Sequence, residues 1–351
     1  MKVLTNGNEA IAEAAVQAGC RFYAGYPITP QNEIPGYFAR RMPEVKGTFI
    51  QSESEIAAIN MVFGAAVAGA RCMTSSSGPG ISLKQEGISY IAACQLPVVI
   101  VNMMRGGPGL GDVSPAQSDY FQATKGGGHG DYHMIVFAPE DVQEAYTLTF
   151  NAFNYADYYR NPVMILGDGI LGQMMEPIEQ VNPSFELPLP EKDYILDGCR
   201  GREARSMMSL FLREGELERH NAILQEKYKR IQEELCLVEM VDVDQSDVVI
   251  VAYGTVARIC NTVMREASNE GIKVGLIRPI TLWPFPAKQI YDKVKNNAKV
   301  LVVEMSAGQM LEDVKLALNG KANIDFLGRM GGGIPLVVDI LKKVVSMKGD
   351  S

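Results

Sequence analysis

The sequence of 351 residues contains six cysteines, and no two of them form a Cys-x-x-Cys pair. Structural zinc and iron–sulfur sites usually need closely spaced thiolates. The spacing therefore argues against a metal cluster held by this chain alone and favours reduced cysteines that pack as small hydrophobic side chains. The six are Cys20, Cys72, Cys94, Cys199, Cys236 and Cys260.

Long hydrophobic runs and an excess of positive charge are also missing. No apolar run reaches the length of about 20 residues that spans a bilayer, and the N-terminal stretch MKVLTNGNEAIAEAA lacks the apolar core of a signal peptide. The formal net charge of -8 argues against a general nucleic-acid-binding surface. We therefore expect a cytoplasmic globular protein without a membrane or nucleic-acid partner.

The first half of the chain alternates continuous apolar segments with helical patterns. Apolar segments of this kind are typical of parallel strands that are covered on both faces. The alternation predicts a doubly wound parallel sheet of the α/β class that ends near residue 180. The predicted strands are 21–26, 47–52, 71–76, 97–104, 133–138 and 162–167.

The segment 181–245 changes character, because it is first rich in proline and then highly charged. Apolar side chains at helical spacing predict one amphipathic helix, a connector packed on a domain surface or on a partner. These side chains are Leu217, Leu224, Tyr228, Ile231 and Leu235. Residues 246–351 then predict a second, smaller α/β domain of ordinary size.

Ligands of open parallel sheets bind at the carboxyl ends of the strands, so the loops that follow the predicted strands deserve inspection. In the loop GYPITPQNEIP, residues 25–35, two prolines stiffen the backbone around Thr29. Thr29 could be a fixed hydrogen-bond donor to a ligand, the N-cap of a helix with Pro30 at its first position, or both.

The stretch SSSGPGISLKQEG, residues 75–87, begins with small residues and continues as a predicted helix. Its backbone N–H groups could meet an anion or a cofactor ring, and a tight turn for close helix packing is the alternative. The loop does not fit a P-loop, because Ile81 and Ser82 follow Gly80.

The glycine-rich loop 105–120 begins with Arg105. An arginine at a strand end can hold a substrate carboxylate with two parallel hydrogen bonds. The alternative is a surface ion pair with Asp112 or Asp119. The glycines of this loop do not fit a dinucleotide-binding fingerprint.

Two further motifs are incomplete. His129, Asp131 and His133 flank a glycine-rich turn, which favours a loop at the rim of a site over a metal centre. The sequence GDG around Asp168 resembles the start of a thiamine diphosphate and Mg²⁺ motif, but the next asparagine, Asn182, comes too early. We therefore expect Asp168 to be a loop residue in a chain that lacks its own diphosphate-binding half.

The stretch QSESEIAAINMVFGAA places Glu55 at the start of an almost wholly apolar helix. Ser52 and Glu55 fit the Ser-x-x-Glu pattern of a capping box, in which the two side chains close the N-terminus of a helix. A carboxyl group that serves a buried site is the other interpretation.

Together these segments resemble one family, the alpha subunits of 2-oxoacid:ferredoxin oxidoreductases, over nearly the whole chain. The resemblance is carried by YPITP, FIQSESEIAAINMVFGAAVAGAR, MTSSSGPGISLKQEGISY, RGGPGLG and GLIRPITLWPFP. It implies a pyrimidine-binding domain of the thiamine-diphosphate fold at 1–180, the connector at 181–245 and a transketolase-like domain at 246–351.

The resemblance also implies partners and cofactors. Thiamine diphosphate would contact this chain through its pyrimidine half. A separate beta subunit would hold the diphosphate, Mg²⁺ and a [4Fe–4S] cluster. A CoA-handling gamma subunit and a ferredoxin-like delta subunit would complete the complex, with ferredoxin, CoA and a 2-oxoacid as its reactants.

Site residues follow from the same resemblance. The family's catalytic glutamate, which hydrogen-bonds N1′ of the aminopyrimidine, matches Glu55, nine residues before Gly64. The family's substrate-binding threonine and arginine match Thr29 and Arg105. The expected cofactor contacts are Tyr26, Pro27, Ile28, Ser77 and Gly78.

The arginine loop indicates the substrate class. It reads RGGPGLG here, whereas the 2-oxoglutarate branch of the family typically reads RGGPSTG. With KGGGHGD and the charged connector, this resembles the branched-chain branch, which acts on 3-methyl-2-oxobutanoate. Leu110 would suit an apolar substrate tail. The alternatives are 2-oxoglutarate or pyruvate as substrate, a non-catalytic scaffold subunit, and a transketolase-type transferase.

Overall fold

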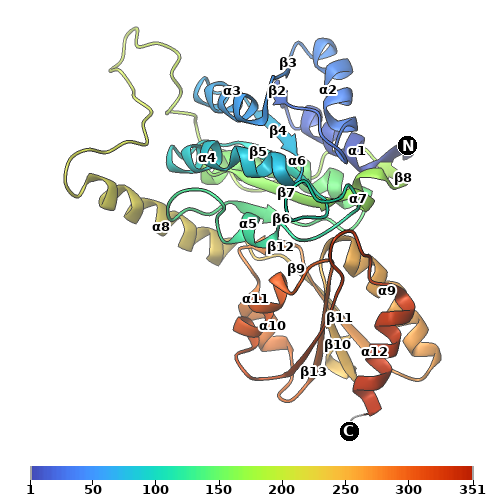
Figure 1. Cartoon of the computed structure of the whole chain (residues 1–351). Coiled ribbons are helices and arrows are strands. Elements are labelled where there is room, and N and C mark those ends of the chain that lie inside the picture. Colours follow the sequence, from blue (N-terminus) through green and yellow to red (C-terminus); the bar gives the residue numbers. More distant parts are fainter. Residues whose placement is uncertain (1, 350–351) are drawn as a thin grey trace.

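The computed structural model describes residues 2–349, which form two α/β domains (Figure 1). The first domain contains a seven-stranded sheet in the order β12-β6-β7-β5-β4-β2-β3. Its parallel strands lie where the apolar segments predict them, so the expected fold class is confirmed. They are β2 (Phe22–Gly25), β3 (Thr48–Gln51), β4 (Cys72–Ser76), β5 (Val99–Met104), β6 (Ile135–Phe137) and β7 (Val163–Asp168).

Helices cover both faces of this sheet. Right-handed crossovers on opposite sides of the sheet centre place successive helices on opposite faces. One layer contains α1 (Gly7–Gln17), which packs against α2 (Glu33–Glu44) and α6 (Val142–Tyr159). The other contains α3 (Glu55–Val67) packed against α4 (Gly78–Ala93). The short helices are α5 (Tyr120–Thr124) and α7 (Gly169–Gln173), and β1 (Lys2–Asn6) pairs with β8 (Met175–Glu179).

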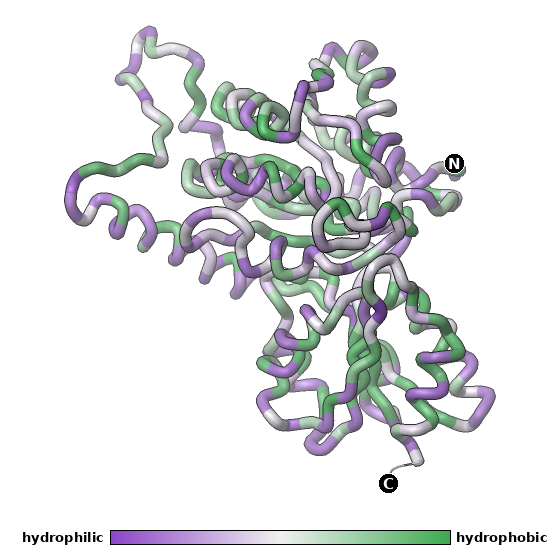
Figure 2. The backbone as a smooth tube through the Cα atoms, viewed as in Figure 1, coloured by the Kyte–Doolittle hydropathy of each residue, from purple (hydrophilic) through white to green (hydrophobic). Residues whose placement is uncertain are grey.

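The second domain contains a five-stranded sheet in the order β14-β13-β10-β11-β9. Its central strands are strongly hydrophobic (Figure 2), as expected for strands covered on both faces. The strands are β9 (Val238–Val241), β10 (Val248–Val251), β11 (Val274–Pro279), β13 (Lys299–Glu304) and β14 (Asn323–Gly328). Helices α9 (Gly254–Asn269) and α12 (Val337–Gly349) pack together, as do α10 (Ala287–Lys293) and α11 (Gln309–Leu318). The 3₁₀ turn η1 is Val243–Gln245.

Two short strands do not follow the sequence pattern. Strand β9 lies inside the stretch expected to be a connector, and it pairs antiparallel with β11. Strand β12 (Thr281–Trp283) follows β11 in the chain but pairs antiparallel with β6 in the first sheet. Trp283 stacks on His133 there, with the ring centroids 4.6 Å apart. Both strands lie outside the strand–helix alternation on which the prediction rests, so only the pairing with a distant strand identifies them.

The connector contains α8 (Glu216–Glu234), which packs on the first domain. Leu224, Tyr228, Ile231 and Leu235 are buried as predicted, whereas Leu217 is 49% exposed. The prediction for Leu217 is wrong because the first turn of α8 extends beyond the body of the domain (Figure 1). Residues 180–215 contain no helix or strand, and much of this stretch projects away from both sheets (Figure 1).

The cysteines follow the sequence-based expectation. All six are free thiols, and Cys20, Cys72, Cys94 and Cys260 are buried. Cys199 is exposed and Cys236 is partly buried. Within residues 2–349, no helix is long and apolar enough to cross a membrane.

Candidate functional site

The loops after β2, β3, β4 and β5 meet at the carboxyl edge of the first sheet. Glu55 begins α3, and Ser54 is the N-cap, since its Oγ accepts a hydrogen bond of 3.1 Å from the Ala57 N–H. The capping box with Ser52 is therefore not formed. Ser52 instead donates to the carbonyl oxygens of Gly25 and Ser54, at 3.1 and 3.0 Å.

The carboxyl group of Glu55 points into the seam between α3 and α4. Glu55 is only 6% exposed, whereas Glu53 lies at the surface. Gly80 on α4 makes this placement possible, because a Cβ at Gly80 would lie 2.6 Å from Glu55 Oε1 and 2.1 Å from Ser76 Oγ. Any larger residue at position 80 would displace the carboxyl group.

Unpartnered polar groups surround this seam. The hydroxyl oxygens of Ser76 and Ser77 are buried and have no hydrogen-bond partner among residues 2–349. Ser77 is the N-cap of α4, and Gly78 follows it with a positive φ of 39°. Buried polar groups are normally satisfied, so an unsatisfied pair beside Glu55 marks a place where a polar ligand fits.

Arg105 reaches this turn from the end of β5. Its Cγ and Nε lie 3.5 and 3.8 Å from the Cβ position of Gly78. Its two Nη atoms donate to the carbonyl oxygens of Thr29 and Leu110, at 3.1 and 3.0 Å. Its Nε is buried and unpartnered within the described chain. Arg105 thus joins three of the four loops, and one of its donors stays available.

The alternative of a surface ion pair is not what the structure shows for Arg105. Asp119 accepts a hydrogen bond of 2.9 Å from Asn102 Nδ2, and Asp112 accepts one of 3.1 Å from the Ser114 N–H. Burial raises the pKa of Asp119, against the opposing effects of the Asn102 hydrogen bond and the Arg105 charge.

Thr29 does not cap a helix. Helix α2 begins at Glu33 with Asn32 in the N-cap position, so the alternative in which the helix starts at Pro30 is not observed. The turn before α2 instead buries Gln31, whose Oε1 accepts a hydrogen bond of 2.5 Å from Ser75 Oγ. Thr29 is exposed, and its Oγ1 accepts from Asn32 Nδ2 at 3.3 Å, which leaves the hydroxyl hydrogen free to donate.

The other expected cofactor contacts lie on the same loop. Tyr26 is 39% exposed, Pro27 is exposed and Ile28 is partly buried. This loop therefore presents an accessible surface beside Arg105.

A cavity of about 810 Å³ opens next to Arg105, between the two domains. Gly78, Ser82 and Leu110 line it from the first domain, and Gln309 and Met330 from the second. Leu110 and Met330 are 80% and 66% exposed, so apolar side chains stand at its mouth. The cavity offers a guanidinium group together with an apolar wall.

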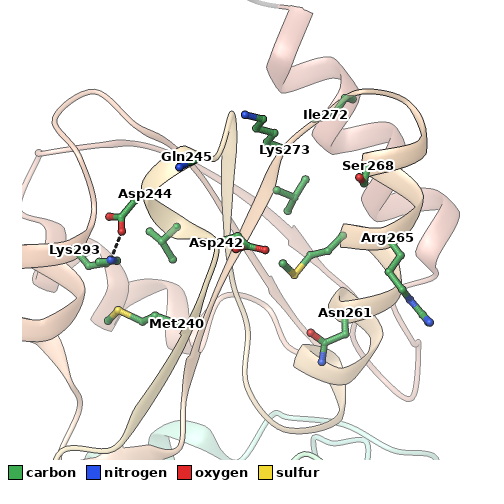
Figure 3. A pocket seen from close by; sticks show the side chains of 13 residues that line it. Met240, Asp242, Asp244, Gln245, Asn261, Arg265, Ser268, Ile272, Lys273 and Lys293 are labelled. Atoms are coloured by element: carbon green, nitrogen blue, oxygen red, sulfur yellow. Dashed lines mark hydrogen bonds and ion pairs between the residues drawn. The ribbon is translucent and has the colours of Figure 1, made fainter.

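A second hollow, of about 690 Å³, lies in the second domain between η1, α9 and β11 (Figure 3). Asp242, Arg265 and Lys273 line it, and Lys293 is paired with Asp244. None of the site residues predicted from the sequence lies there. Its charged groups are of both signs and do not converge (Figure 3), so we assign it no role.

The incomplete motifs have local structural roles. Asp168 is buried, and its Oδ1 accepts from the N–H groups of Ile170 and Leu171, at 2.8 and 3.2 Å, so it caps α7. Its Oδ2 accepts from Thr255 in the second domain. In the part of the chain that the structure describes, no group of three or more potential metal ligands converges, and His133 stacks on Trp283.

Sequence reasoning did not select Ser76, Gly80 or Lys84 as site residues. Lys84 is fully buried on α4, and its Nζ donates to Thr74 Oγ1 at 2.6 Å. The available signal was a lysine on an otherwise small and apolar face of a predicted helix.

Comparison with known proteins places this geometry in a family. Residues 13–231 match the family described as pyruvate flavodoxin/ferredoxin oxidoreductase, thiamine diphosphate-binding. Residues 246–340 match the core domain II of pyruvate:ferredoxin oxidoreductase.

Relatives match over the full chain. The ketoisovalerate oxidoreductase subunit VorB of Methanothermobacter thermautotrophicus is 48% identical over 99% of this chain and 98% of that protein. The 2-oxoglutarate synthase subunit KorA of Methanothermobacter marburgensis is 37% identical over 97% of this chain and 98% of that protein.

Among solved structures, the 2-oxoglutarate:ferredoxin oxidoreductase from Magnetococcus marinus matches with a TM-score of 0.83 and 26% identity, over 99% of this chain and 65% of that chain. The relatives are named as subunits, which implies a multi-subunit enzyme. With Glu55 buried and Arg105 accessible at the carboxyl edge of the same sheet, the chain belongs to the 2-oxoacid:ferredoxin oxidoreductases, as a subunit with a thiamine-diphosphate-binding domain.

Proposed function

We propose that this chain is the pyrimidine-binding subunit of an enzyme that oxidatively decarboxylates a branched-chain 2-oxoacid, 3-methyl-2-oxobutanoate. CoA accepts the acyl group and ferredoxin accepts the electrons. The observation that carries the proposal is the convergence of Glu55 and Arg105 on the turn Gly78–Gly80, beside a cavity rimmed by Leu110. The 48% identity to a ketoisovalerate oxidoreductase subunit supports this substrate class.

The residues in the seam fit an aminopyrimidine ring. Gly78 and Gly80 let the side chains of Arg105 and Glu55 approach the turn closely, and Ser76 and Ser77 offer unpartnered hydroxyl groups. Glu55 would hold a proton at the ring nitrogen N1′, because a carboxyl group within hydrogen-bond distance can exchange a proton with that nitrogen. When bound, thiamine diphosphate supplies the carbon nucleophile and the electron sink that the decarboxylation needs.

Arg105 and Thr29 would hold the substrate carboxylate. The guanidinium of Arg105 already bonds the Thr29 carbonyl oxygen, which keeps the two residues together before a substrate arrives. A charged donor binds a carboxylate more strongly than a neutral one. Leu110 would exclude water from the substrate tail and favour an isopropyl group over a second carboxylate.

We propose further that a separate beta subunit holds the diphosphate, Mg²⁺ and a [4Fe–4S] cluster, and that gamma and ferredoxin-like delta subunits complete the complex. The engagement of Asp168 in capping α7 and in bonding Thr255 supports this division, because its carboxyl group is not free to bind Mg²⁺. The burial of four of the six cysteines also supports it.

The test is an assay of the co-expressed complex with a panel of 2-oxoacids, CoA and a viologen dye. We expect the highest kcat/KM with 3-methyl-2-oxobutanoate. Highest kcat/KM with 2-oxoglutarate or pyruvate would assign the chain to that substrate instead. No dye reduction with any 2-oxoacid would refute the proposal, and a purified complex without iron–sulfur absorbance would favour a transketolase-type transferase.

A substitution of the cavity rim separates the substrate classes. In the same complex, Leu110→Thr should lower kcat/KM for 3-methyl-2-oxobutanoate relative to 2-oxoglutarate by about tenfold, the effect of ~1–3 kcal/mol in a hydrophobic pocket. Leu316→Thr is the control, because Leu316 is also exposed, at 75%, but lies on α11 outside this cavity. An unchanged ratio in Leu110→Thr would remove Leu110 from the site.

A further inference from the structure

Lys84 is a buried charged side chain that the proposed function leaves without a role. None of its surface is exposed, which is rare for lysine. Burial lowers its pKa from 10.5 to about 7, and the charge of Glu55 opposes this shift. Its Nζ has a neutral acceptor in Thr74 Oγ1. Burial destabilises the charged form of this lysine, and the charge of Glu55 is near enough to act on it. This combination indicates a specific role for Lys84.

The packing of α3 against α4 places Lys84 behind the carboxyl group. Gly80 touches Glu55 Oε1, and a Cβ at Gly87 would lie 2.5 Å from Ile59 Cγ2. Lys84 follows Gly80 by four residues and precedes Gly87 by three, so all three share the face of α4 that meets α3. Lys84 therefore lies in the same seam as Glu55, one helical turn deeper.

Among residues 2–349, the other groups around this position are neutral, hydrogen-bonded or exposed. Strand β4 presents the neutral hydroxyls of Thr74 and Ser76 toward α4. Tyr132, from the loop before β6, donates to Gln85 Oε1 at 3.3 Å, and burial raises its pKa. On the side of the cavity, Arg105 donates hydrogen bonds to the backbone carbonyl oxygens of Thr29 and Leu110. Glu53, just before α3, is exposed to solvent.

We propose that Lys84 is a positioning residue for Glu55, which places a positive charge behind the carboxyl group and orients that group toward the pyrimidine ring. This inference rests on the proposed role of Glu55. Lys84 does not touch the substrate, because it is buried and hydrogen-bonded to Thr74. With its pKa lowered to about 7, Lys84 is predominantly charged at acidic pH, so its charge acts on the carboxyl group there.

The experiment compares fully buried Lys84 with partly buried Lys227 in the complete complex. Lys84→Met should move the acid limb of the pH profile of kcat/KM upward by about one pH unit, the lower end of the effect of a close opposite charge. The affinity of the complex for thiamine diphosphate should show the same displacement with pH. Lys227→Met is the matched control. Burial also lowers the pKa of Lys227 to about 7, but its Nζ donates to the Arg160 carbonyl oxygen, away from the site.

Further variants separate charge from packing. Lys84→Arg keeps the charge and should keep the wild-type profile. Lys84→Gln keeps a donor for Thr74 without a charge, and it replaces the methionine variant if that variant does not assemble. The inference is overturned if uncharged variants of Lys84 lose stability and activity equally at every pH, with both profiles unmoved.

The Glu55→Gln variant distinguishes a wrong role for Lys84 from a wrong role for Glu55. If Glu55→Gln stays active, the proposed role of Glu55 is wrong and Lys84 has nothing to position. If Glu55→Gln is inactive while the uncharged Lys84 variants keep wild-type pH profiles, only the role of Lys84 is wrong.

Discussion

Glu55 occupies the first position of α3, where its carboxyl group faces the seam with α4 and lies at the positive end of the helix dipole. Capping is done by Ser54, so the carboxyl group is not used to close the helix. Gly80 has no side chain, and this leaves room for the carboxyl oxygen of Glu55.

Glu55→Gln should reduce kcat by roughly 10²–10⁴-fold, the usual contribution of a proton-transfer group. The amide keeps the shape of the side chain but cannot hold the proton at N1′, so the fold should survive. Dye reduction by the complex measures the loss, and thermal unfolding checks the fold. Glu53→Gln is the control, because Glu53 is exposed two residues earlier. Equal activity of both variants would rule out the catalytic role.

Gly80→Ala should lower both activity and stability. Its Cβ would lie within 3 Å of Glu55 Oε1 and Ser76 Oγ, so both side chains must move. We expect overpacking to cost ~1–3 kcal/mol and the displaced carboxyl group to lower kcat by about 10²-fold. Gly36→Ala on α2 is the matched control, because no atom lies within 4 Å of its Cβ position. A Gly80→Ala enzyme with wild-type kcat would show that the seam tolerates movement.

At the scale of elements, Arg278 on β11 ties the second domain to the first. It is 5% exposed and forms ion pairs of 2.7 Å with Glu144 on α6 and with Glu239 on β9. Glu140, before α6, lies 3.6 Å from the same guanidinium. Burial raises the pKa of Glu140 to about 7, and the charge of Arg278 opposes this. Three carboxylates thus compete for one arginine, and Glu140 is the one least favoured as a charge.

Glu140→Gln should make the protein more stable at pH 8 than the wild type, by roughly 1–3 kcal/mol. The folded pKa lies above the ordinary value of 4.5, so the folded state holds more protons between pH 4.5 and 7. Stability from this group is therefore present at low pH and lost as the pH rises through 7. Chemical denaturation at pH 5 and pH 8 measures the difference, which should shrink at pH 5.

Glu144→Gln is the counterpart, and it should destabilise the protein at both pH values by roughly 3 kcal/mol, because it leaves a buried arginine with a weaker partner. If the two glutamine variants behave alike, the assignment of the carboxylates within the cluster is wrong.

At the scale of the whole molecule, the cavity beside Arg105 exists only because the two domains hold a fixed arrangement. Gln117 is fully buried, and its side-chain amide donates to the Tyr253 carbonyl oxygen at 2.9 Å and accepts from the Met305 N–H at 3.0 Å. Both partners belong to the second domain. One side chain from the first domain thus satisfies two buried backbone groups of the other.

Gln117→Ala should lower the free energy of unfolding by roughly 2–5 kcal/mol, since two buried backbone groups lose their partners at about 1–3 kcal/mol each. Gln143→Ala is the control, because the Gln143 amide bonds both backbone groups of Glu179 in the same way at the surface. Water replaces those bonds, so its effect should stay within about 0.5 kcal/mol. Thermal unfolding measures the stability of the two variants. Equal effects would show that the buried hydrogen bonds of Gln117 do not hold the two domains together.

The predictability of this fold depends on whether an element belongs to the strand–helix alternation along the chain. The parallel strands of the first sheet and the stripe of α8 from Leu224 to Leu235 show their pattern locally, and the structure confirms them. Strands β9 and β12 lie outside this alternation, and antiparallel pairing with strands distant in the chain defines them. Leu217 fits the same helical spacing as its neighbours, and only the packing of the domain exposes it.

The sequence by itself determined the class of fold, because covered parallel strands are continuous apolar runs, and it singled out Glu55, Thr29 and Arg105 as residues at strand ends. Only the tertiary structure decided what surrounds them. The contact of Glu55 with Gly80, the bond from Arg105 to Thr29 and the burial of Lys84 join segments that are distant in sequence. Local patterns report which face of an element is buried, and the partner on that face depends on how the whole chain packs.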